Sequence, residues 1–169
     1  MGGLIFEKEA FSWAIPVKKL VWKPAVRTWC AFTYPDHPQG CPNYRPGRCD
    51  PDRELWINDL LMVQKPMWLV YSEFNLEAHA QRMKEEHPDW TERQCRNLLY
   101  WQPTSKRQMR QRTELFMSVT PGADYPVYLP EYYGVNVYAT AALSGLELEP
   151  IKGLKICHHI ALVGKRKER

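Results

Sequence analysis

Three of the five cysteines in this chain lie close together, in a segment rich in proline, glycine and charge. They are Cys30, Cys41 and Cys49, and the segment reads CAFTYPDHPQGCPNYRPGRCDPD. Proline fixes φ and lacks a backbone donor, so this composition favours neither a helix nor a central strand. We therefore predict a long ordered loop over residues 27–52. Ordering a backbone costs about 1–2 kcal/mol per residue, so a loop of this kind needs something to hold it.

A metal centre bound by the three loop thiolates would supply that stabilisation. Clustered cysteines in a reducing compartment bind metal or carry out redox chemistry more often than they form stable disulfides. The spacing alone is weak evidence, because the chain has neither the paired Cys-x-x-Cys motifs of zinc sites nor ferredoxin spacing. The alternative is a loop whose cysteines are small buried apolar residues, packed by neighbouring aromatic rings.

The loop resembles the signature of an uncharacterised prokaryotic family of predicted metal-binding proteins. The matching pieces are Cys30, CPNY at 41–44 and CDP at 49–51. Two later segments, residues 86–102 and 130–149, also resemble motifs of that family. The resemblance implies a cysteine-bound metal centre, and it implies no particular reaction.

The chain departs from the family pattern at three points. Asp50 stands where a proline is frequent, and Arg45 stands where a glycine is common. The further ferredoxin-like cysteine set of many relatives is missing. We therefore expect no second cluster in this chain.

Thiolate ligands favour zinc or an iron–sulfur cluster. Three loop thiolates would hold three irons of a [4Fe–4S] cluster and leave the fourth iron to another ligand or to a substrate. Cys95, between polar Gln94 and Arg96 on an expected helix, is the best candidate for the fourth ligand; it could equally be a core cysteine. For Zn²⁺, His37 would complete a Cys3His set. We interpret Cys157 as a core residue.

Outside the loop, hydrophobic residues are frequent enough for a core, at 44% of the chain. Periodicity predicts strands within 11–22, 66–74 and 154–165, and helices within 55–63, 75–88, 92–101, 105–117 and 134–145. Asn75 is an expected N-cap, and TERQ at 91–94 matches a capping box. We expect the α/β or α+β class: one domain over residues 1–169, with a central sheet and flanking helices.

Charge and hydropathy restrict the location and the partners. The net charge of +4 comes mainly from residues 106–112 and from the basic tail at 165–169. A basic helix next to aromatic residues is also found in RNA-binding proteins, although most such helices are solvated faces. No apolar run reaches the roughly 18 residues of a membrane span, and the N-terminus does not match a secretory signal. We expect a cytoplasmic protein without a membrane partner.

The leading hypothesis is an iron–sulfur protein with a redox or sulfur-handling role. Cys30, Cys41 and Cys49 would hold a [4Fe–4S] cluster with Cys95 as fourth ligand, and the partner would be a redox protein or a small-molecule substrate. Whether the protein is an enzyme stays open. The alternative is a structural zinc module that acts by binding, for example to RNA through the 105–117 helix. A metal-free fold is the third interpretation.

Overall fold

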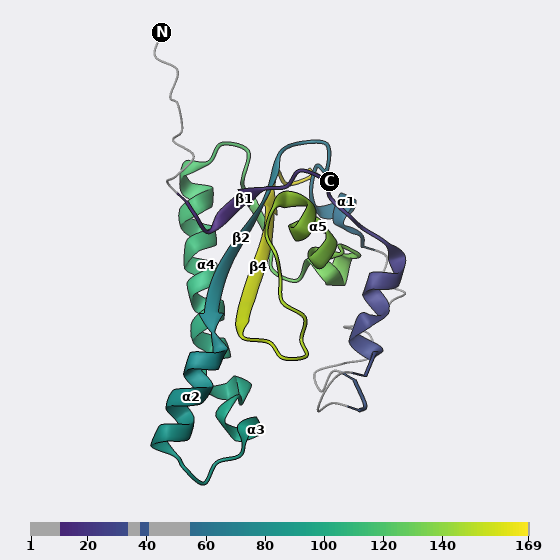
Figure 1. The fold of residues 1–169 in the computed structure, drawn as a ribbon. Helices are drawn as coiled ribbons and strands as arrows, with labels where there is room; N and C mark the ends of the chain where they lie inside the picture. The colour runs from purple at the N-terminus through teal and green to yellow at the C-terminus, as the bar shows by residue number, and fades with distance from the viewer. Residues whose placement is uncertain (1–10, 34–37, 41–54, 169) are drawn as a thin grey trace.

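The computed structural model describes residues 11–33, 38–40 and 55–168. A four-stranded antiparallel sheet in the order β1-β2-β4-β3 forms its centre (Figure 1). The strands are β1 (Ala14–Pro16), β2 (Met67–Asn75), β3 (Tyr125–Val127) and β4 (Ile156–Gly164). β2 and β4 pair along their whole lengths, whereas β1 and β3 are short edge strands. The class is α+β.

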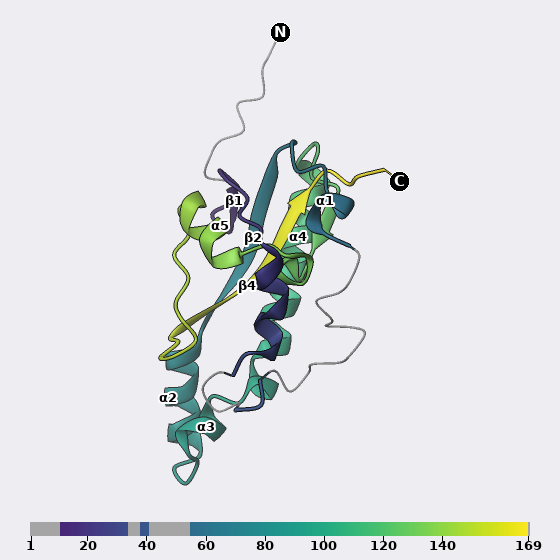
Figure 2. The same ribbon diagram turned by 90° about the vertical axis from the view of Figure 1, so that its right-hand side faces the viewer.

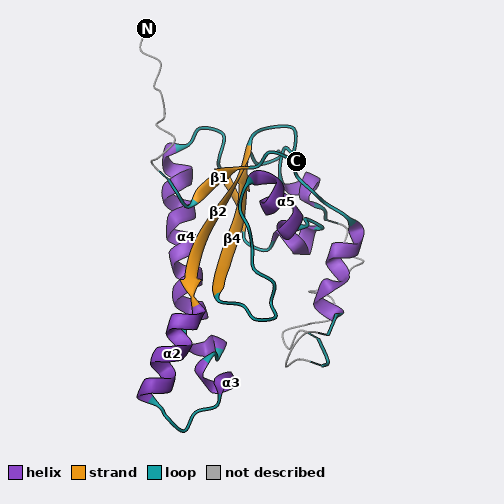
Figure 3. Ribbon diagram, viewed as in Figure 1, coloured by secondary structure: helices purple, strands orange, loops and turns teal. Residues whose placement is uncertain are grey.

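Five α-helices and three 3-10 helices surround this sheet in the described part of the chain (Figure 3). The α-helices are α1 (Ile57–Leu60), α2 (Leu76–Glu86), α3 (Glu92–Cys95), α4 (Gln102–Val119) and α5 (Val137–Ser144). The 3-10 helices are η1 (Pro24–Ala31), η2 (Leu98–Tyr100) and η3 (Pro130–Tyr133). None of the described helices is both long enough and apolar enough to cross a membrane.

Helices cover both faces of the sheet, which explains why β2 is apolar along most of its length. One core contains Leu69 and Leu162 and lies on the side of α5. The other contains Val70 and Ala161, and α4 packs over it. Successive strand residues point to opposite faces, so a strand covered on both sides must be apolar at consecutive positions. Figure 2 shows α5 and α4 on opposite sides of β2.

Two expected helix starts are confirmed by their caps. The Asn75 side chain accepts a hydrogen bond from the Ala78 N–H at 2.9 Å, and α2 follows. Thr91 and Gln94 form the expected capping box at the start of α3. Each cap satisfies backbone donors that the first turn leaves unpaired.

Two expected helix boundaries are wrong. The helix predicted over 92–101 ends at Cys95, because the Asn97 side chain accepts from the Leu99 N–H and starts the separate turn η2. The next helix, α4, begins at Gln102 and extends beyond the predicted range of 105–117. Pro103 lies in its first turn, where no intrahelical donor is needed, and so does not separate the two helices.

The prediction of a loop over the whole of 27–52 is wrong at its start. The 3-10 helix η1 includes Arg27 and continues to Ala31. Pro24 stands at the start of this helix, a position that proline tolerates. The rest of that prediction lies largely outside the described residues.

Two further differences concern the second half of the chain. Tyr125–Val127, where no strand was predicted, is β3, which pairs only with the end of β4. The helix expected from Gly134 begins later, at Val137: Gly134, whose φ is +86°, ends the preceding 3-10 helix η3, and Asn136 then caps α5. Gly145, with a φ of +92°, ends α5 as predicted.

Candidate functional site

The cysteine segment begins with η1, which is fixed at its start and along one side. The Lys23 N–H donates to the Gly134 carbonyl at 2.8 Å. Val26 and Arg27 are buried. The Arg27 guanidinium lies 4.3 Å from the centre of the Trp56 ring. Trp56 follows the segment in the chain, so this cation–π contact joins the two flanks of the cysteine segment.

Gly40 brings the middle of the segment back to the end of η1. Its φ is +81°, in the left-handed region that favours glycine. A Cβ at this position would lie 3.1 Å from the Ala31 carbonyl oxygen and 3.2 Å from that of Phe32. The backbone before Cys41 therefore contacts the backbone that follows Cys30.

The predicted ligands themselves are only partly described. Cys41 and Cys49 lie outside the described residues, as does His37. For Cys30 the structure gives the backbone, in η1, and no side chain. The geometry of the thiolate set therefore stays a prediction.

Cys95, the predicted fourth ligand, is fully buried at the end of α3. The next residue, Arg96, donates to the Leu154 carbonyl at 2.8 Å and pairs with Glu92. Figure 1 shows α3 beside α2 below the sheet, whereas the helix that carries Cys30 lies apart from both, beyond α5, and packs against η3. Burial fits a core cysteine, and the ligand role of Cys95 stays a prediction.

The last strand carries Cys157 and two histidines. Burial raises the pKa of the Cys157 thiol to about 11, so the thiol is protonated near neutral pH. His158 and His159 point to opposite faces, as strand alternation requires. The His158 ring lies 5.6 Å from that of Tyr71, and its Nε2 lies 3.1 Å from a Glu73 carboxylate oxygen.

A buried polar chain connects His159 with two serines. Ser72 Oγ lies 3.0 Å from Ser105 Oγ and donates to the Ser105 carbonyl. Ser105 Oγ in turn lies 2.8 Å from His159 Nδ1. Burial, and secondarily the Lys106 charge, lowers the pKa of His159 to about 4. The sequence analysis did not identify this hydrogen-bonded network, although Ser72, within the apolar run of β2, was a visible signal.

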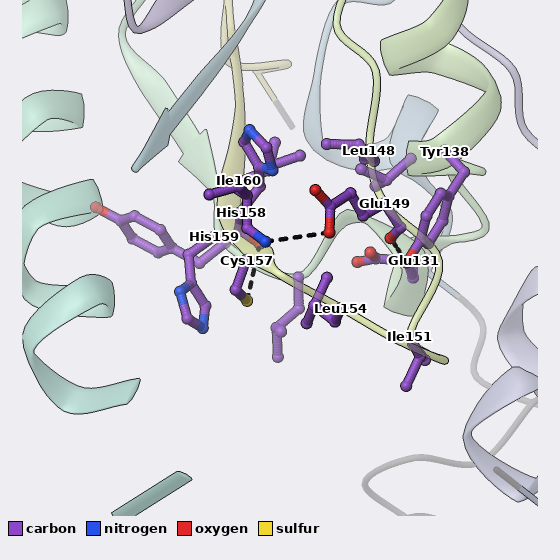
Figure 4. A pocket seen from close by; sticks show the side chains of 14 residues that line it. Glu131, Tyr138, Leu148, Glu149, Ile151, Leu154, Cys157, His158, His159 and Ile160 are labelled. Carbon is purple, nitrogen blue, oxygen red and sulfur yellow. Dashed lines mark hydrogen bonds between the residues drawn. The ribbon is translucent and has the colours of Figure 1, made fainter. Parts of the chain in front are cut away.

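A cavity of about 250 Å³ lies along the half of β4 that β3 does not pair with. Figure 4 shows Glu131, Tyr138 and Glu149 on one side of the strand and His159 on the other. Most of the remaining lining is aliphatic. The family-like segment 130–149 contributes part of this lining, but the sequence did not predict a cavity, because the walls come from η3, α5, β4 and the turn before β4.

The basic residues of the helix predicted to bind RNA are partly engaged. The Arg112 Nη1 donates to the Tyr71 carbonyl at 2.9 Å, and its guanidinium lies 5.5 Å from the centre of the Trp13 ring. The Arg110 guanidinium lies 5.2 Å from the centre of the Tyr128 ring. These contacts hold α4 to the rest of the protein, while Lys106, Arg107 and Arg110 are exposed.

The ranges that the structure describes contain no group of three or more His, Cys, Asp and Glu side chains that could hold a metal ion. Comparison with known proteins finds no matching family model, no matching curated protein and no matching solved structure. The arguments for a function therefore come from this chain alone.

Proposed function

We propose that this protein binds an iron–sulfur cluster through its cysteine segment and has a redox or sulfur-handling role. Cys30, Cys41 and Cys49 are the proposed ligands, and Cys95 is the proposed fourth. The proposal rests on three cysteines in one short proline-rich segment, and on the family resemblance of that segment. A redox protein or a small molecule at an open iron would be the partner.

The contact of Gly40 with the end of η1 is the observation that carries the proposal. It turns the chain back on itself between the first two cysteines, so that the residues adjacent to both lie in contact. A multidentate site requires such a turn, because ligands distant in sequence must converge on one centre. Thiolates preorganised by a rigid backbone lose less conformational entropy on binding.

The Arg27–Trp56 contact gives a second line of support. It joins the helix that carries Cys30 to the residue that follows the segment. Closing the flanks of a loop reduces the number of conformations open to the residues between them. Such a closure would lower the entropy that three thiolates on this segment lose when they bind one centre.

Replacing each cysteine in turn by serine tests which of them bind the cluster. Anaerobically purified wild type should show a broad visible charge-transfer absorption that dithionite bleaches. Cys30→Ser, Cys41→Ser and Cys49→Ser should each lose most of this absorption, because each removes a thiolate from the cluster. Cys95→Ser should reduce it if Cys95 is the fourth ligand. Cys157→Ser is the matched control and should retain the absorption.

Retention of the absorption in all three loop variants would contradict the proposal. Colourless wild type containing one zinc per chain would instead support the alternative, a structural zinc module. In that case the metal would stabilise the segment, and the protein would act by binding. RNA binding through α4 would then be the next function to test.

A further inference from the structure

The cavity beside β4 contains one acidic group that takes part in no described ion pair. Glu131, in η3, is half-buried and lines the cavity. Among the described residues, no ion pair joins its carboxylate to a lysine, arginine or histidine. Burial raises the pKa of the Glu131 carboxyl. The backbone N–H of Glu131 itself is a donor to this carboxyl, but it offsets the effect of burial only in part. A buried carboxylate without a positive partner still costs free energy.

The other acid of the cavity is already engaged. One carboxylate oxygen of Glu149 accepts from the Lys155 N–H at 2.6 Å and from the Ile156 N–H at 3.1 Å. These bonds hold the pKa of Glu149 below its usual value and fix the turn before β4. The Tyr138 hydroxyl donates to the Glu149 carbonyl at 3.3 Å. Glu149 therefore has a structural role that Glu131 lacks.

The histidines of the cavity are engaged as well. His158 Nε2 faces Glu73, and His159 Nδ1 faces Ser105. The lowered pKa of His159 keeps its ring neutral near pH 7. Neither ring is paired with Glu131.

The rest of the lining selects for an apolar ligand of limited size. Seven aliphatic side chains line the space: Leu129, Val137, Leu148, Ile151, Leu154, Ile156 and Ile160. Leu129 and Ile151 are 62% and 57% exposed, more than aliphatic residues with a packing role alone require. The volume of about 250 Å³ is below the usual range for drug-sized ligands, so the ligand is small.

We propose that this cavity binds a small apolar molecule with one ammonium group, and that Glu131 is its counter-ion. The aliphatic walls would bury the apolar part. The ammonium would supply the positive charge that the Glu131 carboxylate lacks, so the cost of burying that carboxylate would be offset only in the complex. None of the lining residues belongs to the cysteine segment, so the site is independent of the proposed cluster.

Hexylamine and hexanol test the proposal as a matched pair, because they share an alkyl chain and differ in charge. Binding is followed at pH 7 by NMR titration of the β4 backbone amides in the full-length protein. We expect hexylamine to bind wild type about tenfold or more tightly than hexanol, as expected for a partly desolvated charge pair. Glu131→Gln should remove this preference and leave hexanol binding unchanged.

Glu147→Gln is the control, because Glu147 is exposed on the loop after α5 and does not line the cavity. It removes the same charge from the molecule and should keep the preference for the amine. Three results would overturn the proposal: no hexylamine binding at β4, equal binding of the two ligands to wild type, or an unchanged amine preference in Glu131→Gln. The wild-type comparison needs no variant to fold.

Discussion

At the level of single residues, the hydrogen-bonded network of Ser72, Ser105 and His159 contributes to the pH dependence of stability. The His159 ring is partly buried, and its Nδ1 is hydrogen-bonded to the Ser105 hydroxyl. Its pKa falls from 6.5 to about 4, first because burial disfavours the charged ring and then because Lys106 is nearby. Folding therefore favours the neutral imidazole.

The predicted consequence is a loss of stability in mild acid. The unfolded chain takes up a proton near pH 6.5, and the folded protein does so only near pH 4. Between these values the unfolded state binds more protons, so the free energy of unfolding falls as the pH falls. We expect His159 to contribute on the order of 1 kcal/mol, allowing for solvent screening. Urea unfolding at several pH values between about 4 and 6.5 measures this contribution.

Matched variants isolate the contribution of His159. His159→Gln keeps a polar group near Ser105 but cannot titrate, so the fall in stability should become smaller. Some fall should remain, because burial also lowers the pKa of His79. The exposed His87 provides the control, and His87→Gln should retain the wild-type fall. An equal fall in wild type and His159→Gln would show that His159 does not cause it.

At the level of elements, the decisive contact is that between η1 and Gly40. Two glycines of the described chain have nearly the same φ in different surroundings. Gly40, at +81°, faces the backbone of Ala31 and Phe32, whereas a Cβ added at Gly122, at +84°, would have nothing within 4 Å. A comparison of the two separates backbone strain from the contact itself.

We predict that Gly40→Ala lowers stability more than Gly122→Ala does. Both variants bear the strain of a left-handed alanine, about 1 kcal/mol. Gly40→Ala must in addition move its loop away from η1, because the neighbouring atoms are backbone. The free energy of unfolding measured in urea should be lower for Gly40→Ala than for Gly122→Ala, and so should the iron content. Equal values for the two would mean that the contact does not organise the segment.

At the level of the whole molecule, strong local signals predicted most of the fold. The apolar run at 66–74 indicated β2, and Asn75 and Thr91 indicated the two helix starts that follow. β3 has no such signal, because it is three residues long, contains Pro126 and depends on pairing with β4. The start of η1 has no distinctive signal either, because a proline such as Pro24 can end a preceding element as well as begin a helix.

The site was less predictable than the fold, for a related reason. The polar chain joins residues 33 and 54 positions apart in the sequence, so no spacing rule connects them. Glu131 could not be predicted as a site residue, because the walls of its cavity come from several elements. The cysteines, in contrast, were conspicuous because they are close in sequence, and their geometry stays a prediction.

The central claim is the cluster, and metal analysis of wild type tests it most directly. The protein is purified anaerobically, and iron, acid-labile sulfide and zinc are measured in the same sample. We predict iron and sulfide in equal amounts, close to the stoichiometry of one [4Fe–4S] cluster per chain, with little zinc. One zinc per chain with neither iron nor sulfide, or no metal at all, would contradict the claim.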